Sequence, residues 1–274
     1  MRLESLLASE LDSRVKGFPG GVAPLPLSAV GQQGWNILRQ DLPLPVMVLH
    51  EQALAHNLAQ FHGIMKRHRL HLCPHGKTTM APQLFARQLA AGAWGITAAS
   101  VSQVQVYRYY GVPRIILANQ LLGLAAVRSI VAELHADPSF EFYCLVDSVA
   151  QANLLAAQAR SAGARRPIQV LLEGGVAGGR TGVRTLAEGE AVLTALAAAN
   201  DVLAVAGVEG FEGVIKGHGA EAAAAVDAFI GFLQGLLAAC WQRGLRGPCA
   251  EGALLLSVGG TALVDRVLAA YPDG

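Results

Sequence analysis

Short apolar runs alternate with longer segments of helical periodicity along most of this chain, and this alternation limits the possible folds more than any other feature. Repeated strand–helix units are typical of parallel strands joined by crossover helices. The runs are almost continuously apolar, as burial on both faces of a sheet requires. The predicted strands are residues 45–49, 70–73, 94–97, 114–118, 141–146, 168–172, 204–208 and 253–256, and the clearest predicted helices are 51–67, 81–92, 101–111, 149–163 and 220–244.

Polar and glycine-containing loops follow the runs, so they would gather at the carboxyl ends of the strands. Both a (β/α)8 barrel and an open doubly wound sheet place functional loops there, and the pattern alone does not decide between them. The length of 274 residues suits one barrel. From Leu70 to Leu256 we count about seven strand–helix units, and no eighth barrel strand is visible after them. We therefore predict an α/β fold, a (β/α)8 TIM-like barrel over residues 41–274 that is incomplete at its C-terminal end, after an N-terminal extension over residues 1–40.

The charge balance, 21 Lys+Arg against 20 Asp+Glu, lacks the basic excess that a nucleic-acid partner needs. Charged residues make up only 15%, against about 25% in ordinary globular domains, which leaves open whether a partner covers some of the surface. The apolar stretch 222–241 contains Asp227 and Gln234, and we interpret it as a packed barrel helix rather than a membrane span. The N-terminus does not resemble a signal peptide.

The four cysteines, Cys73, Cys144, Cys240 and Cys249, show no CxxC or metal-finger spacing. We interpret them as buried reduced thiols, which indicates a reducing compartment. Together with the absent leader, this predicts a cytoplasmic protein with no membrane and no nucleic-acid partner.

Lys77 is one of only four lysines and directly follows a predicted strand, between Gly76 and Thr78. A lysine at the mouth of a barrel loses part of its hydration, which lowers its pKa and favours the amine needed for a Schiff base. The alternative is a surface lysine at the start of a helix. His75 shares the face of Lys77 if the strand extends that far, and it would position a cofactor or a substrate carboxylate; a histidine satisfied by the local backbone is the alternative.

Two glycine-rich loops could bind an anion. Residues 257–261 (SVGGT) precede a helical stretch, where glycine N–H groups and the hydroxyls of Ser257 and Thr261 would serve a phosphate. An ordinary glycine turn is the alternative. Residues 174–182 form the second loop, with Arg180 as a contact for an anionic or aromatic cofactor or, alternatively, as a solvated side chain. The other seven histidines show no compact metal spacing.

Residues 74–79 (PHGKTT) and 88–95 (QLAAGAWG) resemble the Schiff-base segment of the alanine-racemase-like, fold type III, pyridoxal-phosphate enzymes. The resemblance is to the branch of D-threonine aldolase and D-serine dehydratase, and within it to bacterial amino acid deaminases. It runs from about Pro43 to Thr261 with order and spacing kept. The further matching segments are Asn119-Gln120, residues 178–183 (GGRTGV), residues 210–213 (GFEG) and residues 257–261 (SVGGT).

The resemblance implies pyridoxal 5'-phosphate bound to Lys77 as a Schiff base. It implies that Gly259, Gly260, Thr261 and Ser257 hold the phosphate, and that Arg180, His75 and Asn119 lie at the cofactor. A D-amino acid would replace Lys77, the ring would act as electron sink for a Cα carbanion, and the released Lys77 would accept a proton. Loss of the α-proton and β-hydroxyl would make a dehydratase, and Cα–Cβ cleavage an aldolase.

Two departures from the family pattern bear on this interpretation. Phe211 stands at the substrate side where the branch often has Tyr, so a hydroxyl is missing. The family also continues into a C-terminal β-domain with a His-x-Asp or His-x-Cys site for a divalent metal, Zn or Mn, and this chain ends before it. We therefore expect no metal ligands within the chain.

Three hypotheses follow from the sequence. The first is a pyridoxal-phosphate-dependent lyase acting on a small D-amino acid, with D-serine dehydratase-like deamination and, as the near alternative, D-threonine aldolase-type cleavage. The second is a barrel that binds the cofactor without strong turnover. The third is an α/β domain without a ligand. The resemblance also implies a homodimer.

Overall fold

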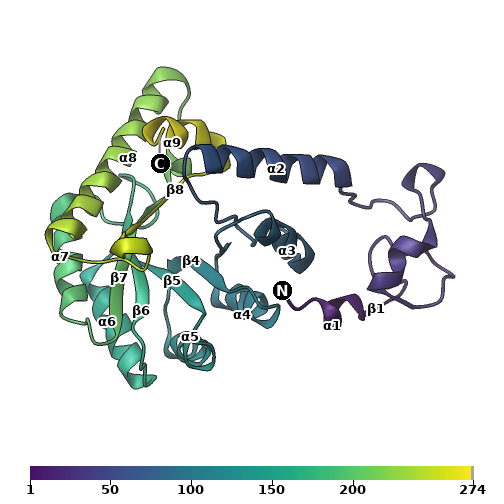
Figure 1. The fold of residues 1–274 in the computed structure, drawn as a ribbon, viewed down its shortest axis with the longest axis horizontal. Coiled ribbons are helices and arrows are strands. Elements are labelled where there is room, and N and C mark those ends of the chain that lie inside the picture. The colour runs from purple at the N-terminus through teal and green to yellow at the C-terminus, as the bar shows by residue number, and fades with distance from the viewer. Residues whose placement is uncertain (273–274) are drawn as a thin grey trace.

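The computed structural model describes residues 1–272, apart from the side chains of Ala250 and Thr261, and its centre is a six-stranded parallel sheet. The strand order follows the chain from β3 to β8 without a reversal (Figure 1). The strands are β3 (Ile96–Ala98), β4 (Arg114–Gln120), β5 (Glu141–Val146), β6 (Ile168–Gly174), β7 (Leu203–Gly210) and β8 (Leu255–Val258).

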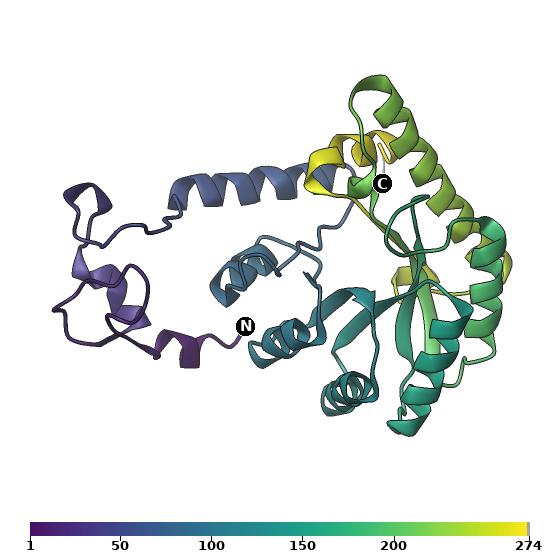
Figure 2. The ribbon, with the colours of Figure 1, turned by 180° about the vertical axis from the view of Figure 1, so that it is seen from behind.

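The strand order decides between the two architectures that the sequence left open. A doubly wound sheet reverses its order at a switch point and carries helices on both faces. Here the order never reverses, and the connecting helices lie along the outer side of a curled sheet, as Figures 1 and 2 show. The fold is therefore a half-barrel, an incomplete TIM-like barrel as predicted. The helices that follow the strands are α4 (Val101–Tyr109), α5 (Leu124–Ala136), α6 (Val149–Ser161), α7 (Leu186–Ala197), α8 (Gly219–Gln242) and α9 (Val264–Ala270).

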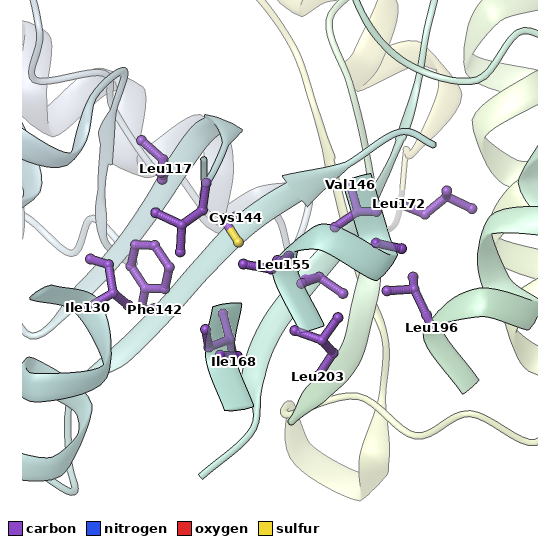
Figure 3. Close-up of a cluster of buried hydrophobic side chains, with 14 of the residues drawn as sticks. Leu117, Ile130, Phe142, Cys144, Val146, Leu155, Ile168, Leu172, Leu196 and Leu203 are labelled. Atoms are coloured by element: carbon purple, nitrogen blue, oxygen red, sulfur yellow. The ribbon is translucent and has the colours of Figure 1, made fainter. Parts of the chain in front are cut away.

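Alternate residues of the central strands enter two different cores. Phe142, Cys144 and Val146 of β5 pack outward against the helices in the main cluster, part of which Figure 3 shows. Tyr143 and Leu145, between them, join a smaller cluster on the inner face of the sheet. All five side chains are buried, and removing one such side chain from water stabilises the fold by roughly 1.5–3 kcal/mol. Burial on both faces explains why these strands are continuously apolar in the sequence.

Two of the eight predicted strands do not form. Residues 45–49 have no neighbour to pair with, and Met47 is 90% exposed, so the prediction of a strand there was wrong. Residues 70–73 are not a regular strand either. The segment that continues them lies beside β3: Trp94 N–H donates to Leu72 O, Thr97 N–H to Pro74 O and Gly76 N–H to Thr97 O, at 2.7, 2.8 and 2.9 Å. This segment therefore extends the sheet, without regular pairing, beyond its β3 edge.

The N-terminal part is built from short elements and one long helix. Figures 1 and 2 show the first elements at the far end of α2 from the sheet. The start of the chain returns to the half-barrel, where the Arg2 N–H donates to the Tyr110 carbonyl at 2.8 Å. The division of the chain at residue 40 stays a prediction. The elements are α1 (Glu4–Leu7), β1 (Glu10–Leu11), β2 (Leu25–Pro26), two 3₁₀ helices at Leu27–Gln33 and Ile37–Arg39, α2 (Glu51–Arg67) and α3 (Pro82–Ala90).

Helix α8 is long and apolar enough to cross a membrane by length and composition. Its Phe229, Leu233 and Leu236 are buried in the main core, where the helix packs on β6 and β7. A core helix passes the same composition test as a membrane span, and the packing here is that of a core helix, as predicted from the sequence.

Gly207 provides a test of the pairing between β7 and β8. A Cβ at this position would lie 1.9 Å from the Leu255 carbonyl oxygen, where no atom fits. We expect Gly207→Ala to lower the free energy of unfolding by more than about 2 kcal/mol, since the strands must separate locally. The matched control is Gly231→Ala in α8, which has open space around it and should raise that free energy by roughly 0.5–1 kcal/mol. Urea unfolding of both variants measures the difference, and equal stabilities would contradict this account of the strand contact.

Candidate active site at the carboxyl ends of the strands

Three polar side chains stand side by side at the carboxyl ends of neighbouring strands. Glu173 of β6 is in register with Glu209 of β7, and Glu209 is in register with Ser257 of β8. Residues in register on parallel strands point to the same face. This face is the inner one, because Leu171 and Leu255, two positions earlier on β6 and β8, belong to the inner cluster. The inner wall therefore changes from apolar to polar at this end of the sheet.

The Glu173 carboxylate is buried and fully engaged. It accepts hydrogen bonds from Thr181 Oγ1 and Gln120 Nε2, both at 2.5 Å. Burial and the nearby Asp147 raise the pKa of Glu173, and the two hydrogen bonds and the charge of Arg180 oppose this rise only in part. The pairing with Gln120 ties the end of β4 to the end of β6 across the mouth of the half-barrel.

Glu209 has the most strongly shifted carboxyl group of this wall. Its side chain is buried, and burial together with the charges of Glu173 and Glu212 raises the pKa of Glu209 to about 8. The charge of Arg180 opposes the shift. At pH 7 the Glu209 carboxyl is therefore mostly neutral and can donate a hydrogen bond, which an ionised carboxylate cannot do.

The loop that carries Arg180 is held by another arginine, Arg184. The Arg184 guanidinium donates to the carbonyl oxygens of Thr181, Gly182 and Gly179. The loop is also tied to β5, because Gly182 N–H donates to Asp147 Oδ2 at 3.1 Å. Arg180 itself is exposed and close enough to act electrostatically on both Glu173 and Glu209. The structure thus places the predicted arginine at the mouth, above the two carboxyl groups.

The glycine loop after β8 directs two backbone donors at one carboxylate. Gly259 N–H donates to Glu212 Oε2 at 3.0 Å, and Gly260 N–H donates to Glu212 Oε1. Glu212 is only 1% exposed and lies in a 3₁₀ turn, Glu212–Val214, directly after β7. The prediction that Gly259 and Gly260 contact a phosphate stays a prediction, and the side chain of Thr261 lies outside the described part of the chain.

Phe211 packs over the same loop. Its ring carbons would lie 2.4 Å from a Cβ at Gly213, where a side chain could not fit without a shift of the ring, and 3.0 Å from a Cβ at Gly260, which is a tight contact. The Phe211 side chain is 42% exposed. The predicted contact between Phe211 and a substrate stays a prediction.

Lys77 sits at the opposite edge of the sheet and at the same end. The segment before it runs parallel to β3, with a bridge between His75 and Thr97, so Lys77 comes where this segment leaves the sheet. Gly76 is buried, and a Cβ there would lie 2.6 Å from Tyr107 Oη and 2.9 Å from the Phe85 ring. Only glycine therefore fits at position 76 without a shift of these side chains. The next residue, Lys77, is exposed to solvent.

The imidazole of His75 lies against the backbone of Lys77. Lys77 N–H donates to His75 Nδ1 at 3.4 Å. Burial first, and the charge of Lys77 second, lower the pKa of His75. At neutral pH His75 is therefore more often uncharged than a free histidine, and it adds no positive charge beside the Lys77 amine.

Asn119 is exposed on β4 and donates to the Ala99 carbonyl oxygen at 3.3 Å. Its neighbour Gln120, not Asn119, faces Glu173 across the mouth. Gln120 points to the inner face, where it is in register with Leu145, because it lies four positions after Ile116 of the inner cluster and side chains alternate along a strand. The pairing shift between Leu117 and Gln120 advances β4 by two residues relative to β5, which leaves the two faces unchanged.

The structure brings the predicted Arg180, Ser257, Gly259 and Gly260 to one wall, with three carboxyl groups that the sequence analysis had not singled out. These are Glu173, Glu209 and Glu212. The sequence did contain a pattern that could have identified them, because each is a charged residue at or just after the end of an apolar run. Among residues 1–272, no group of three or more His, Cys, Asp or Glu side chains could hold a metal ion.

Comparisons with known proteins agree on the fold. Residues 49–256 match the model of the family "Alanine racemase, N-terminal domain". The chain is 30% identical over 188 residues to a D-threonine aldolase from Arthrobacter sp, which covers 68% of this chain and 47% of that protein. The chain thus spans about half the length of this curated relative.

Two solved structures share the architecture. D-threonine aldolase from Filomicrobium marinum superposes with a TM-score of 0.65 at 24% identity, covering 80% of this chain and 62% of the other. D-threo-3-hydroxyaspartate dehydratase from Delftia sp. HT23 gives a TM-score of 0.63 at 21% identity, covering 80% and 60%. At these identities the likeness concerns the fold. With a family match over most of its length and a parallel half-barrel as its structure, this chain belongs to the alanine racemase N-terminal domain family, of fold type III.

Proposed function

We propose that this protein is a pyridoxal-phosphate-dependent lyase acting on a D-amino acid that carries a β-hydroxyl group, with Lys77 as the residue that binds the cofactor covalently. The observation that carries the proposal is the position of Lys77. It is an exposed amine at the carboxyl end of the sheet, directly after a glycine that the packing requires, and at the same end as the glycine loop after β8.

The residues present fit a cofactor with an aldehyde and a phosphate. Lys77 takes part in no ion pair among the described residues, so its amine is available to an aldehyde carbon. The loop after β8 holds the Glu212 carboxylate through two of its backbone N–H groups and also carries the Ser257 hydroxyl, a further donor that a phosphate could use. Membership of the family supports the same cofactor.

When bound, the cofactor supplies an electron sink for charge that develops at Cα of the substrate. Three residues of this chain have proposed roles beside it. Lys77, displaced by the amino group of the substrate, accepts or returns a proton at its Nζ. His75, held largely uncharged, leaves the positive charge of the site to Lys77 and Arg180. The neutral carboxyl of Glu209 avoids an additional negative charge beneath a substrate that is itself a carboxylate.

The names of the relatives support the substrate class. One is a D-threonine aldolase and another a D-threo-3-hydroxyaspartate dehydratase, and both names describe D-amino acids with a β-hydroxyl. Aldol cleavage would break the Cα–Cβ bond as the β-hydroxyl loses its proton, whereas dehydration would break the Cα–H bond and then the Cβ–O bond. The 30% identity to an aldolase favours Cα–Cβ cleavage, and D-serine dehydratase-like deamination remains the second candidate.

Several parts of the proposal rest on the family alone. We propose a homodimer, a cytoplasmic location and a dependence on a divalent cation, Zn or Mn, whose ligands we expect outside this chain. The exposed Phe211 is the proposed substrate contact, and it offers a ring without a hydroxyl.

The first test is chemical trapping of the cofactor. We expect the purified protein to acquire a visible absorbance band with pyridoxal phosphate, and borohydride reduction followed by peptide mass mapping should place the adduct on Lys77. Lys77→Ala should abolish the band. The control Lys216→Ala removes another exposed lysine, in the C-terminal half of the chain, and should keep the band. The proposal would be contradicted by an adduct spread over several lysines, or by the absence of any adduct in a folded sample.

The second test separates a lyase from a protein that only binds the cofactor. The loaded protein should consume D-threonine or D-serine with Mn²⁺ or Zn²⁺ added, and chelation should remove the activity. Aldehyde formation identifies aldol cleavage, and 2-oxo acid formation identifies deamination. Full occupancy of Lys77 without consumption of either amino acid would contradict the lyase and favour a binding protein.

The third test concerns the charge of Glu209. In the unfolded chain Glu209 ionises near its ordinary pKa of 4.5, whereas in the folded protein its pKa is about 8. The contribution of Glu209 to stability is therefore fully present below about pH 4.5 and is lost as the pH rises to about 8. Glu209→Gln cannot ionise, so its free energy of unfolding should rise relative to wild type between pH 5 and pH 8.

Urea unfolding at pH 5, 6.5 and 8 measures this relative change. The control is Glu221→Gln, an exposed position at the start of α8, for which the difference from wild type should stay constant with pH. A constant difference for Glu209→Gln as well would show that the Glu209 carboxyl is not held neutral by the fold.

A further inference from the structure

The contact between Glu212 and the glycine loop joins two separate parts of the chain. Glu212 follows β7, and Gly259 and Gly260 follow β8, so 47 and 48 residues separate the partners. Both oxygens of the carboxylate are used, one for each N–H group. A carboxylate that accepts two backbone N–H bonds forms charge-assisted hydrogen bonds, which are stronger than neutral ones.

Phe211, the neighbour of Glu212, packs against the same loop. The Phe211 ring lies so close to Gly260 that a Cβ there would be 3.0 Å from its nearest carbon. Gly259 has a φ of +109°, a conformation that only glycine adopts readily. Residues 211 and 212 therefore contact a loop whose shape depends on glycine at position 259.

Two roles for Glu212 are conceivable, and burial decides between them. If a phosphate took the Gly259 and Gly260 N–H groups, it would have to expel the carboxylate. Glu212 is 1% exposed, so it would then remain as an unpaired buried charge beside a second anion, or the turn would have to open. Keeping the carboxylate in place avoids both penalties and leaves the rest of the loop, including the Ser257 hydroxyl, free for an anion.

From this geometry we infer that Glu212 is a positioning residue for cofactor phosphate: it stays bound to Gly259 and Gly260, shapes the loop after β8, and directs the phosphate to the other donors of that loop. The inference rests on the proposed function, since it assumes that pyridoxal phosphate is the ligand. It refines the expectation that the two glycines themselves contact the phosphate, because it assigns their N–H groups to the protein's own carboxylate.

The test compares two aldehydes that differ only in the phosphate. Pyridoxal and pyridoxal phosphate can both react with Lys77, and only the second uses the loop. In Glu212→Ala we expect the dissociation constant of pyridoxal phosphate to rise by about tenfold or more, with little change for pyridoxal, because two charge-assisted hydrogen bonds that hold the loop are lost. Glu212→Gln keeps one acceptor oxygen and should lie between wild type and Glu212→Ala. Titration of the visible absorbance measures the dissociation constants of both aldehydes for wild type and the two variants.

Two controls separate positioning from loss of structure. Glu221→Ala removes an exposed carboxylate from α8 and should change neither constant. Hydrogen exchange in the cofactor-free protein should be faster at the Gly259 and Gly260 amides of Glu212→Ala and unchanged in β5 and β6. Equal weakening of both aldehydes would mean that the substitution damages the site as a whole, and it would overturn the inference.

The remaining outcomes are distinguishable. Tighter binding of pyridoxal phosphate by Glu212→Ala would show that the carboxylate competes with the phosphate, which also overturns the inference while leaving the proposed function intact. If Glu212→Ala bound both aldehydes as tightly as wild type, the inference would likewise be overturned and the proposed function left intact. If wild type itself formed no adduct at Lys77, the proposed function would fail first and the role of Glu212 toward phosphate would fail with it.

Discussion

The parallel register between β6, β7 and β8 is the constraint on which the rest of the molecule depends. It puts Glu173, Glu209 and Ser257 in one row at the carboxyl ends of three strands. The same register turns alternate residues outward, where they enter the main core beneath the helices. A slip of one residue would move the carboxyl groups into that core, where an unpaired charge is far more costly than at the mouth. Core packing and site geometry therefore share one hydrogen-bonding pattern.

The three carboxyl groups at this end of the sheet differ in their hydrogen-bond partners and in the burial and charge around them. Glu173 accepts hydrogen bonds from Thr181 and Gln120, and Glu212 accepts them from two backbone N–H groups. Glu209 has no such partner among the side chains and backbone groups that the structure describes. The unsupported group is the one that takes up a proton, since burial and the negative charge of its two neighbours act on it together. The surroundings of Glu209 thus set its pKa apart from that of an ordinary glutamate.

The site draws on both edges of an open sheet. Lys77 comes from the segment beyond β3, and the glycine loop comes from the end of β8. In a flat sheet these two edges would be the farthest parts of the structure. The sheet is curled, and the proposed site combines the lysine at one edge with the glycine loop at the other, both at the carboxyl ends of the strands.

Many of the strands and helices could be predicted from the sequence. The apolar runs at 114–118, 141–146 and 168–172 became strands, and 51–67 became a helix with the predicted bounds, because local periodicity and burial agree there. The identity of Lys77 as the reactive lysine stays a prediction that the sequence alone supplied, since its motif is local. Residues 45–49 failed as a strand because a strand exists only with a partner, and pairing is a property of the whole fold.

Only the tertiary structure decided which side chains meet. It placed Glu212 on the amides of Gly259 and Gly260, brought Gln120 of β4 to Glu173 of β6, and raised the pKa of Glu209 through burial and the charges of the neighbouring carboxyl groups. Each of these depends on residues tens of positions apart. A sequence determines the periodicity of its own segments, whereas register, burial and charge proximity arise only when the segments pack.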